Sequence, residues 1–183
     1  DEGALVAVNY SSSKAGADRV VAEIIAKGGK AVAVHGNLSE PQQIKGVIDA
    51  TKKAFGVIDI LVNNAGVSQR SYALNTSLEV DRELFEVNFF GSVAVTKGIA
   101  PLMVSQGSGH IVVISSMAGK YGFRMRSAYS ASKHALQGYF ETLRALLELL
   151  MAQAILAESV NDRFLRSEHR CSVILRTDSW GRN

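Results

Sequence analysis

Tyr129 and Lys133 are the residues of this sequence whose types and spacing suggest chemistry most directly. Residues four apart share a face of an α-helix, so the phenol and the ammonium can approach one another. A free tyrosine titrates at about pH 10, too high for efficient proton exchange at neutral pH, and a nearby fixed cation favours the phenolate. Ser116 lies upstream at the end of a strand-like run, where its hydroxyl can hydrogen-bond a substrate oxygen. The three side chains together predict acid–base chemistry on an oxygen atom.

Each of these residues also has an ordinary structural explanation. A tyrosine and a lysine four apart are common as an amphipathic surface pair on a helix. Two serines, Ser115 and Ser116, after a strand are ordinary loop residues. The functional hypothesis therefore depends on the other motifs that occur with them.

The elements that must position these residues follow from the apolar pattern. Short apolar runs predict buried strands at 5–8, 31–34, 58–62 and 111–114. Helical spacing of apolar residues predicts helices between them, at about 20–27, at 41–55, at 78–104 with a kink at Pro101, and at 128–150. Strands that alternate with helices predict the α/β class, with a parallel sheet covered on both faces.

The last 33 residues, 151–183, follow a different pattern from residues 1–150. Residues 151–157 could prolong the last helix, and 171–175 could form one more strand, but 158–170 are polar without a clear period. We therefore divide the chain into a domain over 1–150 and an atypical tail over 151–183 whose structure the pattern does not define.

Composition excludes several classes of protein. With 183 residues, 47% of them hydrophobic and 20% charged, the chain is neither disordered nor collagen-like, and it is long enough for one domain with a core. A formal net charge of +3, spread singly or in pairs, does not predict a nucleic-acid partner. No apolar run reaches the roughly 18 residues of a membrane span. The single cysteine, Cys171, fits a reducing compartment and a cytoplasmic location, and the four histidines lie too far apart to predict a metal site.

Four motifs in order make the sequence resemble the classical short-chain dehydrogenases/reductases. They are Asn63-Asn64-Ala65-Gly66, Asn88 within Val-Asn-Phe-Phe-Gly, Ser115-Ser116, and Tyr129-x-x-x-Lys133. The intervals from Asn64 through Asn88, Ser116 and Tyr129 to Lys133 are 24, 28, 13 and 4 residues, and they fit the family pattern throughout. The resemblance covers roughly residues 1–145.

This resemblance implies a Rossmann-type doubly wound parallel sheet and hydride transfer between a nicotinamide cofactor and a carbonyl or secondary alcohol. Tyr129 would act as the general acid or base, Ser116 would polarise the carbonyl oxygen, and Lys133 would favour the phenolate and bind the nicotinamide ribose. Asn88 would complete the proton path through a water molecule. Asn64, Ala65 and Gly66 would line the cofactor pocket. Relatives form homodimers or homotetramers through two of these helices, so the same assembly is expected of a complete chain.

The cofactor preference is partly readable from the loop after the first predicted strand. Relatives that prefer NAD usually end this strand with an acidic residue that binds the ribose 2′-hydroxyl. Here the loop contains Tyr10, Ser11 and Ser12 with Lys14 nearby and no acid, which favours NADP, with NAD less favoured. Asn37-Leu38 matches the family's adenine-side pair, although a strand-ending Asn is also a common turn former.

The pattern departs from the family at both ends. The glycine-rich phosphate turn TGxxxGxG is absent, and the match begins just before the family's second strand, so the first strand and its turn are missing. We expect an incomplete sheet in which the two neighbours of the central strand lose their shared partner. A catalytically inactive family-like fragment, or a subunit that binds a partner through its helices, is therefore the alternative function. The substrate itself is not readable, but Tyr121, Phe123 and Met125 suggest that part of it is apolar.

Overall fold

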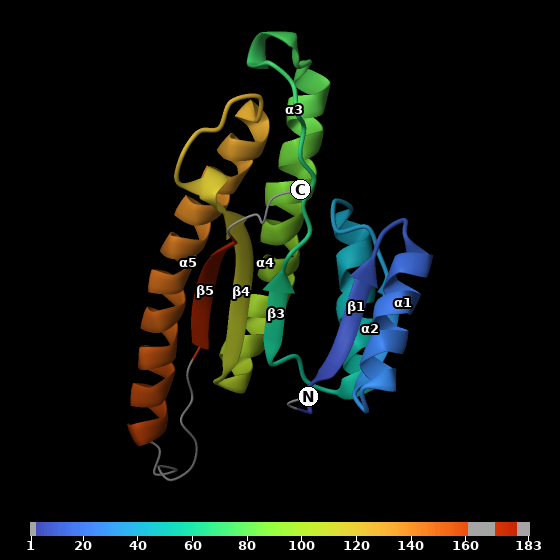
Figure 1. Cartoon of the computed structure of the whole chain (residues 1–183). Coiled ribbons are helices and arrows are strands. Elements are labelled where there is room, and N and C mark those ends of the chain that lie inside the picture. Colours follow the sequence, from blue (N-terminus) through green and yellow to red (C-terminus); the bar gives the residue numbers. More distant parts are fainter. Residues whose placement is uncertain (1–2, 161–170, 179–183) are drawn as a thin grey trace. The chain divides into compact units, whose positions relative to one another are not determined.

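The computed structural model describes residues 3–160 and 171–178, with side chains up to residue 150 (Figure 1). The strands are β1 (Leu5–Tyr10), β2 (Lys30–His35), β3 (Ile60–Asn63), β4 (Gly109–Ser116) and β5 (Cys171–Asp178). The helices are α1 (Lys14–Ala26), α2 (Pro41–Phe55), α3 (Leu78–Phe85), α4 (Gly91–Gln106) and α5 (Ser127–Val160). Short helical turns cover Ala73–Asn75, Glu86–Phe90 and Met117–Gly119. Strands alternate with helices along the chain, which confirms the predicted α/β class.

All described strand pairs are parallel, and they form two separate sheets. One sheet has the order β1-β2 and the other the order β3-β4-β5. Matched to the doubly wound order 3-2-1-4-5-6, these sheets correspond to strands 3-2 and 4-5-6, so the strand without a counterpart is the central one. The edge residues Leu5, Ile60 and Val62 are 50%, 56% and 53% exposed, as expected for apolar strands that lack a neighbour. The expectation of an incomplete parallel sheet is therefore confirmed.

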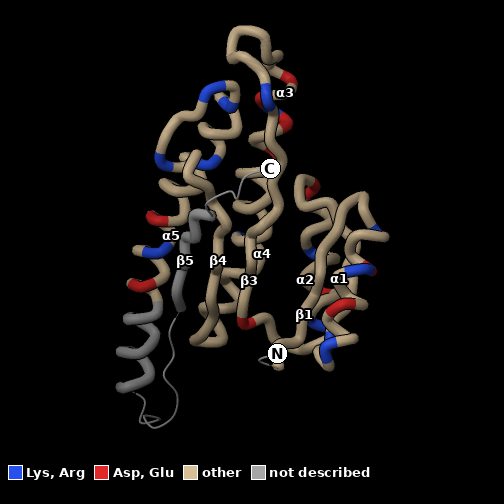
Figure 2. The backbone as a smooth tube through the Cα atoms, viewed as in Figure 1, with Lys and Arg blue, Asp and Glu red and all other residues tan. Residues whose placement is uncertain are grey.

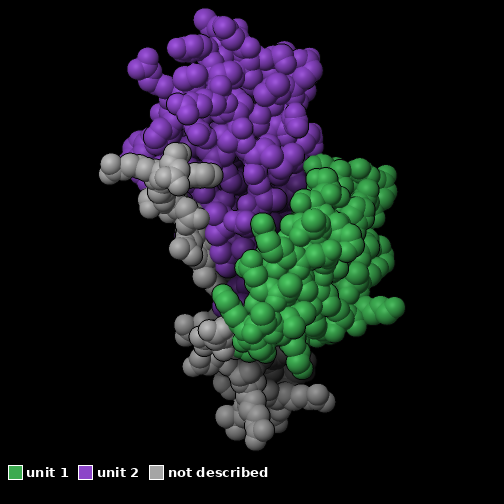
Figure 3. Space-filling view, turned by 45° about the vertical axis from the view of Figure 1, so that its right-hand side comes forward, with its two compact units in different colours: residues 1–58 green, residues 59–183 purple. Residues whose placement is uncertain are grey.

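The chain divides into two compact units, residues 1–58 and 59–183, which Figure 3 colours separately. The boundary proposed from sequence, between residues 150 and 151, lies inside α5. The two units are groups of residues that pack together, and they say nothing about function. The division into a functional domain over 1–150 and a tail over 151–183 therefore stays a prediction.

In unit 1, α1 and α2 cover the β1-β2 sheet. Ala17 of α1 and Val34 of β2 are buried, together with Ile44, Val47 and Ile48 of α2. Pro41 lies in the first turn of α2, where its missing N–H needs no partner, and Gly56 ends the helix with a φ of 88°, which favours glycine. The helix predicted over 41–55 is therefore confirmed with the same bounds.

Unit 2 has its core between β4, α4 and α5. Met103, Ile111, Val113, Leu136 and Phe140 are at most 1% exposed. The alternate residues Ile111 and Val113 face the same side of β4, and the helices α4 and α5 supply the other three side chains. This packing holds the carboxyl end of β4 against the first turns of α5.

Several local expectations are refined by the structure. The helix predicted over 78–104 is three segments, because a π-helical turn at Glu86–Phe90 separates α3 from α4. Pro101 lies inside α4, which continues to Gln106, and the kink there stays a prediction. The strand predicted at 58–62 begins at Ile60 and ends at Asn63.

The two hypotheses for the tail are confirmed in their secondary structure. The last helix continues through residues 151–157 to Val160, and the predicted strand at 171–175 is β5, which pairs in parallel with β4 and extends to Asp178. Most of the polar stretch 158–170 lies outside the described residues.

One helical stretch of the described residues is long and apolar enough to cross a membrane by length and composition. It is Leu78–Gln106. The most apolar 18 consecutive residues of this stretch have a mean hydropathy of 1.4 and are 50% buried within the protein. Val95, Thr96 and Ile99 of this stretch lie in the core of unit 2. The core helix of a protein that spans no membrane can have the same length and hydropathy. The predicted absence of a membrane span therefore stays a prediction.

Candidate active site

The carboxyl ends of β3 and β4 bring the central candidate residues to one edge of the sheet. Asn64, Ala65 and Gly66 follow β3 directly, and Ser116 is the last residue of β4. Neighbouring parallel strands end at the same edge, which is where open α/β sheets bind ligands. The first turns of α5 carry Tyr129 and Lys133 to this edge, where Lys133 bonds the Ile114 carbonyl of β4.

Asn88 connects the loop after β3 with α5. Its side chain is fully buried, its Oδ1 accepts a hydrogen bond from the Val67 N–H (2.7 Å), and its Nδ2 donates to the Val67 carbonyl (2.9 Å). The same Nδ2 donates to Ser132 Oγ (3.0 Å), and Ser132 Oγ donates to the Tyr129 carbonyl (2.9 Å). Asn88 lies in the π-helical turn, and such turns often occur at functional sites.

Lys133 is a buried cation beside the same residues. It is 4% exposed, and its Nζ donates to the Ile114 carbonyl of β4 (3.0 Å). Burial lowers the pKa of Lys133 below its ordinary value, because the charged ammonium loses its solvation. The Nζ lies 5.9 Å from the centroid of the Tyr129 ring. The structure thus brings the two residues of the helical pair to the buried face of α5, whereas the surface-pair explanation requires an exposed face.

Gly66 lies against both Asn88 and Lys133. A Cβ atom on Gly66 would be 3.3 Å from Asn88 Oδ1 and 3.5 Å from Lys133 Nζ. The motif from the end of β3, the asparagine of the π turn and the lysine of α5 therefore meet at one point, although they are far apart in the sequence.

The Tyr129 ring is held by apolar neighbours. It is 6% exposed and packs with Leu84 of α3, Ala118 and Ala128, with Val80 at the edge of this cluster. Its backbone N–H donates to the Gln69 side-chain oxygen (3.3 Å). Both the ring and the backbone of Tyr129 are therefore fixed by residues from other elements.

Ser116 caps the short helical turn Met117–Gly119 that follows β4. It is 4% exposed, and its Oγ accepts a hydrogen bond from the Ala118 N–H (3.2 Å). The described hydrogen bonds of Ser116 and Tyr129 run to other partners, so the structure does not join the two hydroxyls directly. Ser115 Oγ is buried without a hydrogen-bond partner in the described part of the chain, and a Cβ on Gly119 would lie 2.5 Å from it.

The remaining predicted cofactor residues belong to unit 1, which is described separately. The Tyr10 ring contacts the His35 ring at a centroid distance of 5.2 Å, and His35 Nε2 lies 3.1 Å from the Ser11 carbonyl oxygen. Ser12 is exposed, and Lys14 forms an ion pair with Asp18 (2.6 Å). Most of the predicted ribose loop is thus accessible, but its lysine already has an acidic partner.

The adenine-side pair also lies in unit 1, after β2. The Asn37 N–H donates to Gln43 Oε1 (2.8 Å), and Asn37 Oδ1 accepts from the Ser39 N–H (3.0 Å). Leu38 is half-buried beside it. This Asn37 geometry is the turn-forming arrangement that the sequence left open, and it keeps the backbone of the pair in a defined conformation.

Four contacts of the site were not expected from the sequence. Ser132 links Asn88 to Tyr129, Thr96 accepts a hydrogen bond from Asn63 (3.0 Å), and Gln69 and Arg126 contact Tyr129. Thr96 could have been noticed as a polar residue among apolar neighbours of a helix. No local pattern in the sequence marks Gln69 or Arg126. Gln69 contacts a residue 60 positions later in the chain, and Arg126 is held by a residue 58 positions earlier.

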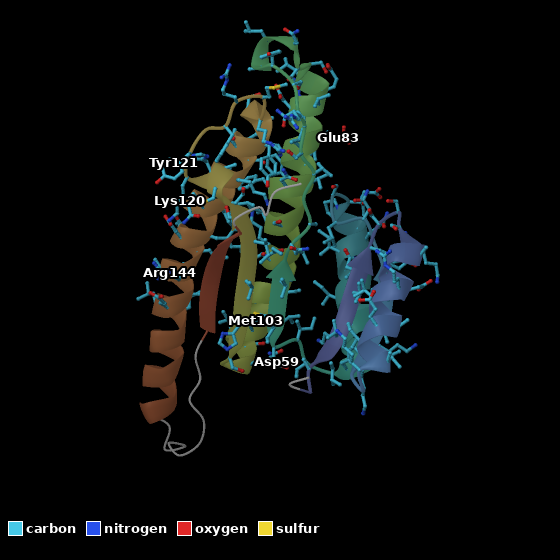
Figure 4. All side chains as sticks on the ribbon, viewed as in Figure 1. Asp59, Glu83, Met103, Lys120, Tyr121 and Arg144 are labelled. Carbon is cyan, nitrogen blue, oxygen red and sulfur yellow. The ribbon has the colours of Figure 1, made fainter. Side chains whose placement is uncertain are left out.

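The loop after β4 is basic. It carries Lys120, Arg124 and Arg126, and the sequence has no Asp or Glu between Glu86 and Glu141 (Figure 2). Lys120 and Tyr121 extend outward from this loop, and Tyr121 is 62% exposed (Figure 4). Tyr121, one of the three residues that suggest a partly apolar substrate, therefore lies at the surface.

Residues 3–160 and 171–178 contain no group of three His, Cys, Asp or Glu side chains that could hold a metal ion. A hollow of about 330 Å³ on α3 is lined by Leu78, Asp81, Arg82, Phe85, Glu86 and Phe90. None of these six residues belongs to the cluster around Asn88 and Lys133, so the hollow is separate from the candidate active site.

The sequence model of the short chain dehydrogenases matches residues 1–154, and the chain belongs to this family. Among curated relatives, dehydrogenase/reductase SDR family member 7B of Mus musculus is 47% identical over 112 residues, which are 61% of this chain and 35% of that protein. The protein of the same name from Danio rerio is 54% identical over 98 residues, or 54% of this chain and 32% of that protein. The chain thus spans about a third of the length of the curated relatives that it matches.

Solved structures of the family share the fold. Acetoin dehydrogenase from Enterobacter cloacae is 33% identical with a TM-score of 0.73, over 80% of this chain and 58% of that chain. A gluconate 5-dehydrogenase from Burkholderia cenocepacia J2315, solved in complex with NADP and tartrate, is 26% identical with a TM-score of 0.72, over 78% of this chain and 56% of that chain. These similarities confirm the Rossmann-like fold predicted from the motifs.

Proposed function

We propose that this protein is an oxidoreductase that transfers hydride between NADP and a carbonyl or secondary alcohol, with Tyr129 as the general acid or base. One observation carries the proposal: Gly66, Asn88 and Lys133 meet beside the Tyr129 ring, although the family motifs they belong to are far apart in sequence. The proposal is also supported by membership of the short chain dehydrogenase family and by the titles of the similar structures, which name dehydrogenases.

The residues present fit a nicotinamide cofactor. At Gly66 the backbone approaches Asn88 and Lys133 closely enough that a side chain would fill the space between them. The Lys133 ammonium has three donor hydrogens, and Ile114 is the acceptor described for one of them, so the group has the capacity to bind ribose hydroxyls. When bound, NADPH supplies the hydride to the carbonyl carbon.

The proton is handled by residues of this chain. In the reducing direction, the Tyr129 hydroxyl gives its proton to the substrate oxygen while Ser116 donates a hydrogen bond to the same oxygen. The Lys133 charge stabilises the negative charge that develops on the phenol as the proton leaves. Both amide hydrogens of Asn88 already bind Val67 and Ser132, so we propose that its side chain holds the loop and α5 in place. The water of the proton path would then be held by other atoms.

NADP is proposed over NAD on the chemistry of the loop after β1. Tyr10, Ser11 and Ser12 offer hydroxyl groups and no carboxylate where NAD-preferring relatives carry an acid. Asn37 and Leu38 would lie on the adenine side, and Asn64 and Ala65 on the pocket wall. The cocrystallised NADP of the gluconate 5-dehydrogenase shows that a similar fold binds this cofactor. A homodimer or homotetramer in the cytoplasm remains part of the proposal.

The alternative is an inactive family-like subunit that binds a partner. It is favoured for residues 1–183 taken alone, because the β1-β2 and β3-β4-β5 sheets are separate and the family's phosphate-binding turn follows the strand that would join them. Residues that could contact such a partner include Leu146 and Leu149 of α5, which are 49% and 56% exposed.

Deuterium transfer distinguishes the two functions. The full-length protein, meaning the chain with a first strand and glycine-rich turn ahead of residue 1, is incubated with diacetyl, the diketone related to acetoin. The NADPH carries deuterium at both C4 positions of the nicotinamide, so either face transfers the label. Acetophenone serves as a second, more apolar carbonyl probe. We expect deuterium on the new carbinol carbon of at least one product. NADPH oxidation without deuterium in any alcohol, or no reaction with either ketone despite NADPH binding, would favour the inactive subunit.

A further inference from the structure

Two loops of unit 2 are tied together beside the start of α5. The first loop, residues 67–72, follows the motif at the end of β3, and the second, residues 123–127, leads into α5. The Ser71 N–H donates to the Met125 carbonyl (3.1 Å), and Arg126 Nη1 donates to Ser68 Oγ (2.5 Å). Met125 has a φ of 61°, a left-handed conformation that is uncommon for a residue other than glycine. The second loop thus adopts a strained backbone where it contacts the first.

Gln69 of the first loop binds the first turn of α5 through both ends of its amide. Its Oε1 accepts from the Tyr129 N–H (3.3 Å), and its Nε2 donates to Ser127 Oγ (3.4 Å). The first N–H groups of a helix have no partner within the helix, and a side chain usually satisfies one of them. Here that side chain comes from a different loop. The two bonds are long individually, but together they fix the backbone of Tyr129 relative to the loop after β3.

Arg126 places a second positive charge near the Tyr129 ring. The guanidinium carbon lies 5.6 Å from the ring centroid, and Lys133 Nζ lies 5.9 Å from the same point. Both distances are within the range of cation–π attraction. Burial lowers the pKa of Lys133, whereas a guanidinium remains charged at every pH at which proteins are folded. Arg126 therefore places a second charge beside the ring, and its hydrogen bond to Ser68 holds it there.

We propose that Gln69 and Arg126 are positioning residues for Tyr129: Gln69 holds its backbone, and Arg126 adds positive charge beside its ring. The loop after β3 thereby determines how well Tyr129 exchanges its proton. This inference rests on the proposed function, in which Tyr129 moves that proton. If the contacts serve only loop packing, their removal will change stability and leave the rate of the chemical step intact.

Variants at Gln69 separate its two hydrogen bonds. Gln69→Leu removes both, whereas Gln69→Glu keeps an oxygen that accepts from the Tyr129 N–H and loses the donor to Ser127. In NADPH-dependent reduction of diacetyl by the full-length protein, we expect Gln69→Leu to lower kcat about tenfold with KM for NADPH within about twofold. We expect Gln69→Glu to recover most of kcat. A Gln69→Glu protein as slow as Gln69→Leu would overturn the assignment of the acceptor.

Arg126 has a matched control in the same loop. Arg124 is exposed and carries the same charge, and no contact of Arg124 with the Tyr129 ring is described. We expect Arg126→Met to lower kcat about tenfold, Arg126→Lys to retain most of it, and Arg124→Met to leave it within about twofold. Equal rates for Arg126→Met and Arg124→Met would overturn the role of Arg126. If Arg126→Met does not fold, Arg126→Gln takes its place, because it keeps an N–H donor for Ser68 and removes the charge; a kcat equal to that of the unmodified protein would then overturn the role of Arg126.

A readout independent of catalysis accompanies these rates. Amide exchange of Tyr129, followed by NMR, should be at least about tenfold faster in Gln69→Leu and unchanged in Arg124→Met, because Gln69 is the described acceptor for that N–H. Tyr129→Phe is measured in parallel. A normal rate in Tyr129→Phe contradicts the proposed function, whereas a lost rate there with normal rates in Gln69→Leu and Arg126→Met contradicts this inference alone.

Discussion

Lys133 is the residue at which stability and the proposed chemistry conflict. Its ammonium is buried, and burial lowers its pKa from an ordinary value of 10.5. A buried charge that serves only structure is costly and readily replaced by an apolar side chain. Its presence beside Gly66 and Asn88 is accounted for by the positive charge that the proposed proton transfer needs.

This conflict predicts the behaviour of Lys133→Met. We expect kcat and NADPH affinity both to fall, because the variant lacks the charge beside Tyr129 and the ribose contact. At pH 7 we expect the free energy of unfolding of the variant to equal or exceed that of the unmodified protein. Steady-state kinetics, a cofactor titration and urea denaturation measure the three quantities. A large loss of stability with a normal rate would assign Lys133 a structural role.

The same pKa shift predicts a pH dependence of stability. The native pKa of Lys133 is below the unfolded value of 10.5, so between the two the unfolded chain binds more protons and stability rises with pH. The unfolding free energy of the unmodified protein minus that of Lys133→Met should therefore increase as the pH rises toward 10.5. A difference that is constant from pH 7 upward would show that the ammonium is solvated.

Tyr10 tests the cofactor assignment at the residue scale. A carboxylate introduced by Tyr10→Asp would repel a 2′-phosphate and accept hydrogen bonds from a free 2′-hydroxyl. We expect the ratio of kcat/KM for NADPH over NADH to fall at least tenfold, or about 1.4 kcal/mol. The control is Tyr10→Phe, which keeps the ring contact with His35 and should change the ratio much less. An unchanged ratio in Tyr10→Asp would show that this loop does not contact the ribose.

At the scale of elements, the site depends on a π-helical turn and on glycines that permit close approach. The turn at Glu86–Phe90 is flanked by α3 and α4, so Asn88 has a position that a continuous α-helix would not provide. The apolar periodicity over 78–104 indicates a helix but does not show an extra residue in one turn. This is why the helix could be predicted from the sequence and its interruption could not.

Two glycines give a matched pair of predictions for these elements. Gly66→Ala places a Cβ 3.3 Å from Asn88 Oδ1 and 3.5 Å from Lys133 Nζ, so we expect a small loss of stability and a fall in kcat of about tenfold. Gly109→Ala places a Cβ 2.5 Å from Met103 Cγ in the core, so we expect a loss of about 1–3 kcal/mol in unfolding free energy with little change in kcat. Denaturation and kinetics of both variants check this. Identical effects of the two substitutions would show that Gly66 is an ordinary packing position.

Some residues of the candidate site could be predicted from the sequence, but many of their contacts could not. Asn88, Ser116, Tyr129 and Lys133 could be proposed from motif spacing, and the structure gathers the first and last of them against Gly66. The contacts of Ser132 and Gln69 could not be predicted. Ser132 bonds Asn88, 44 residues away, and Gln69 bonds Tyr129, 60 residues away. Their partners depend on how β3, β4 and α5 pack, and no local pattern encodes that packing.

At the scale of the whole molecule, the separate sheets are the feature with the largest consequence. The alternation of strands and helices predicted the parallel order within each sheet, and the absent glycine-rich turn predicted that the neighbours of the central strand would lack a shared partner. The course of residues 151–160 and 171–178 could only be suggested, because short apolar runs fit strands and helices alike.

This incomplete sheet predicts how residues 1–183 behave alone. Without a central strand and its turn, we expect negligible NADPH binding by calorimetry and a broad thermal transition, since the apolar edges at Leu5, Ile60 and Val62 are exposed. The control is the same chain with a first strand and glycine-rich turn supplied ahead of residue 1, which should bind NADPH and unfold cooperatively. Micromolar binding by residues 1–183 alone would contradict the assignment of the phosphate site to that turn.

The central claim, that Tyr129 moves the proton, is tested most directly by Tyr129→Phe in the full-length protein. The substitution removes one oxygen atom and leaves the ring packed against Leu84 and Ala118 with Lys133 in place. We expect kcat for NADPH-dependent carbonyl reduction to fall below about a tenth of its value, with the Kd for NADPH within a few-fold by fluorescence titration. A folded Tyr129→Phe protein that keeps more than about a tenth of kcat would contradict the account.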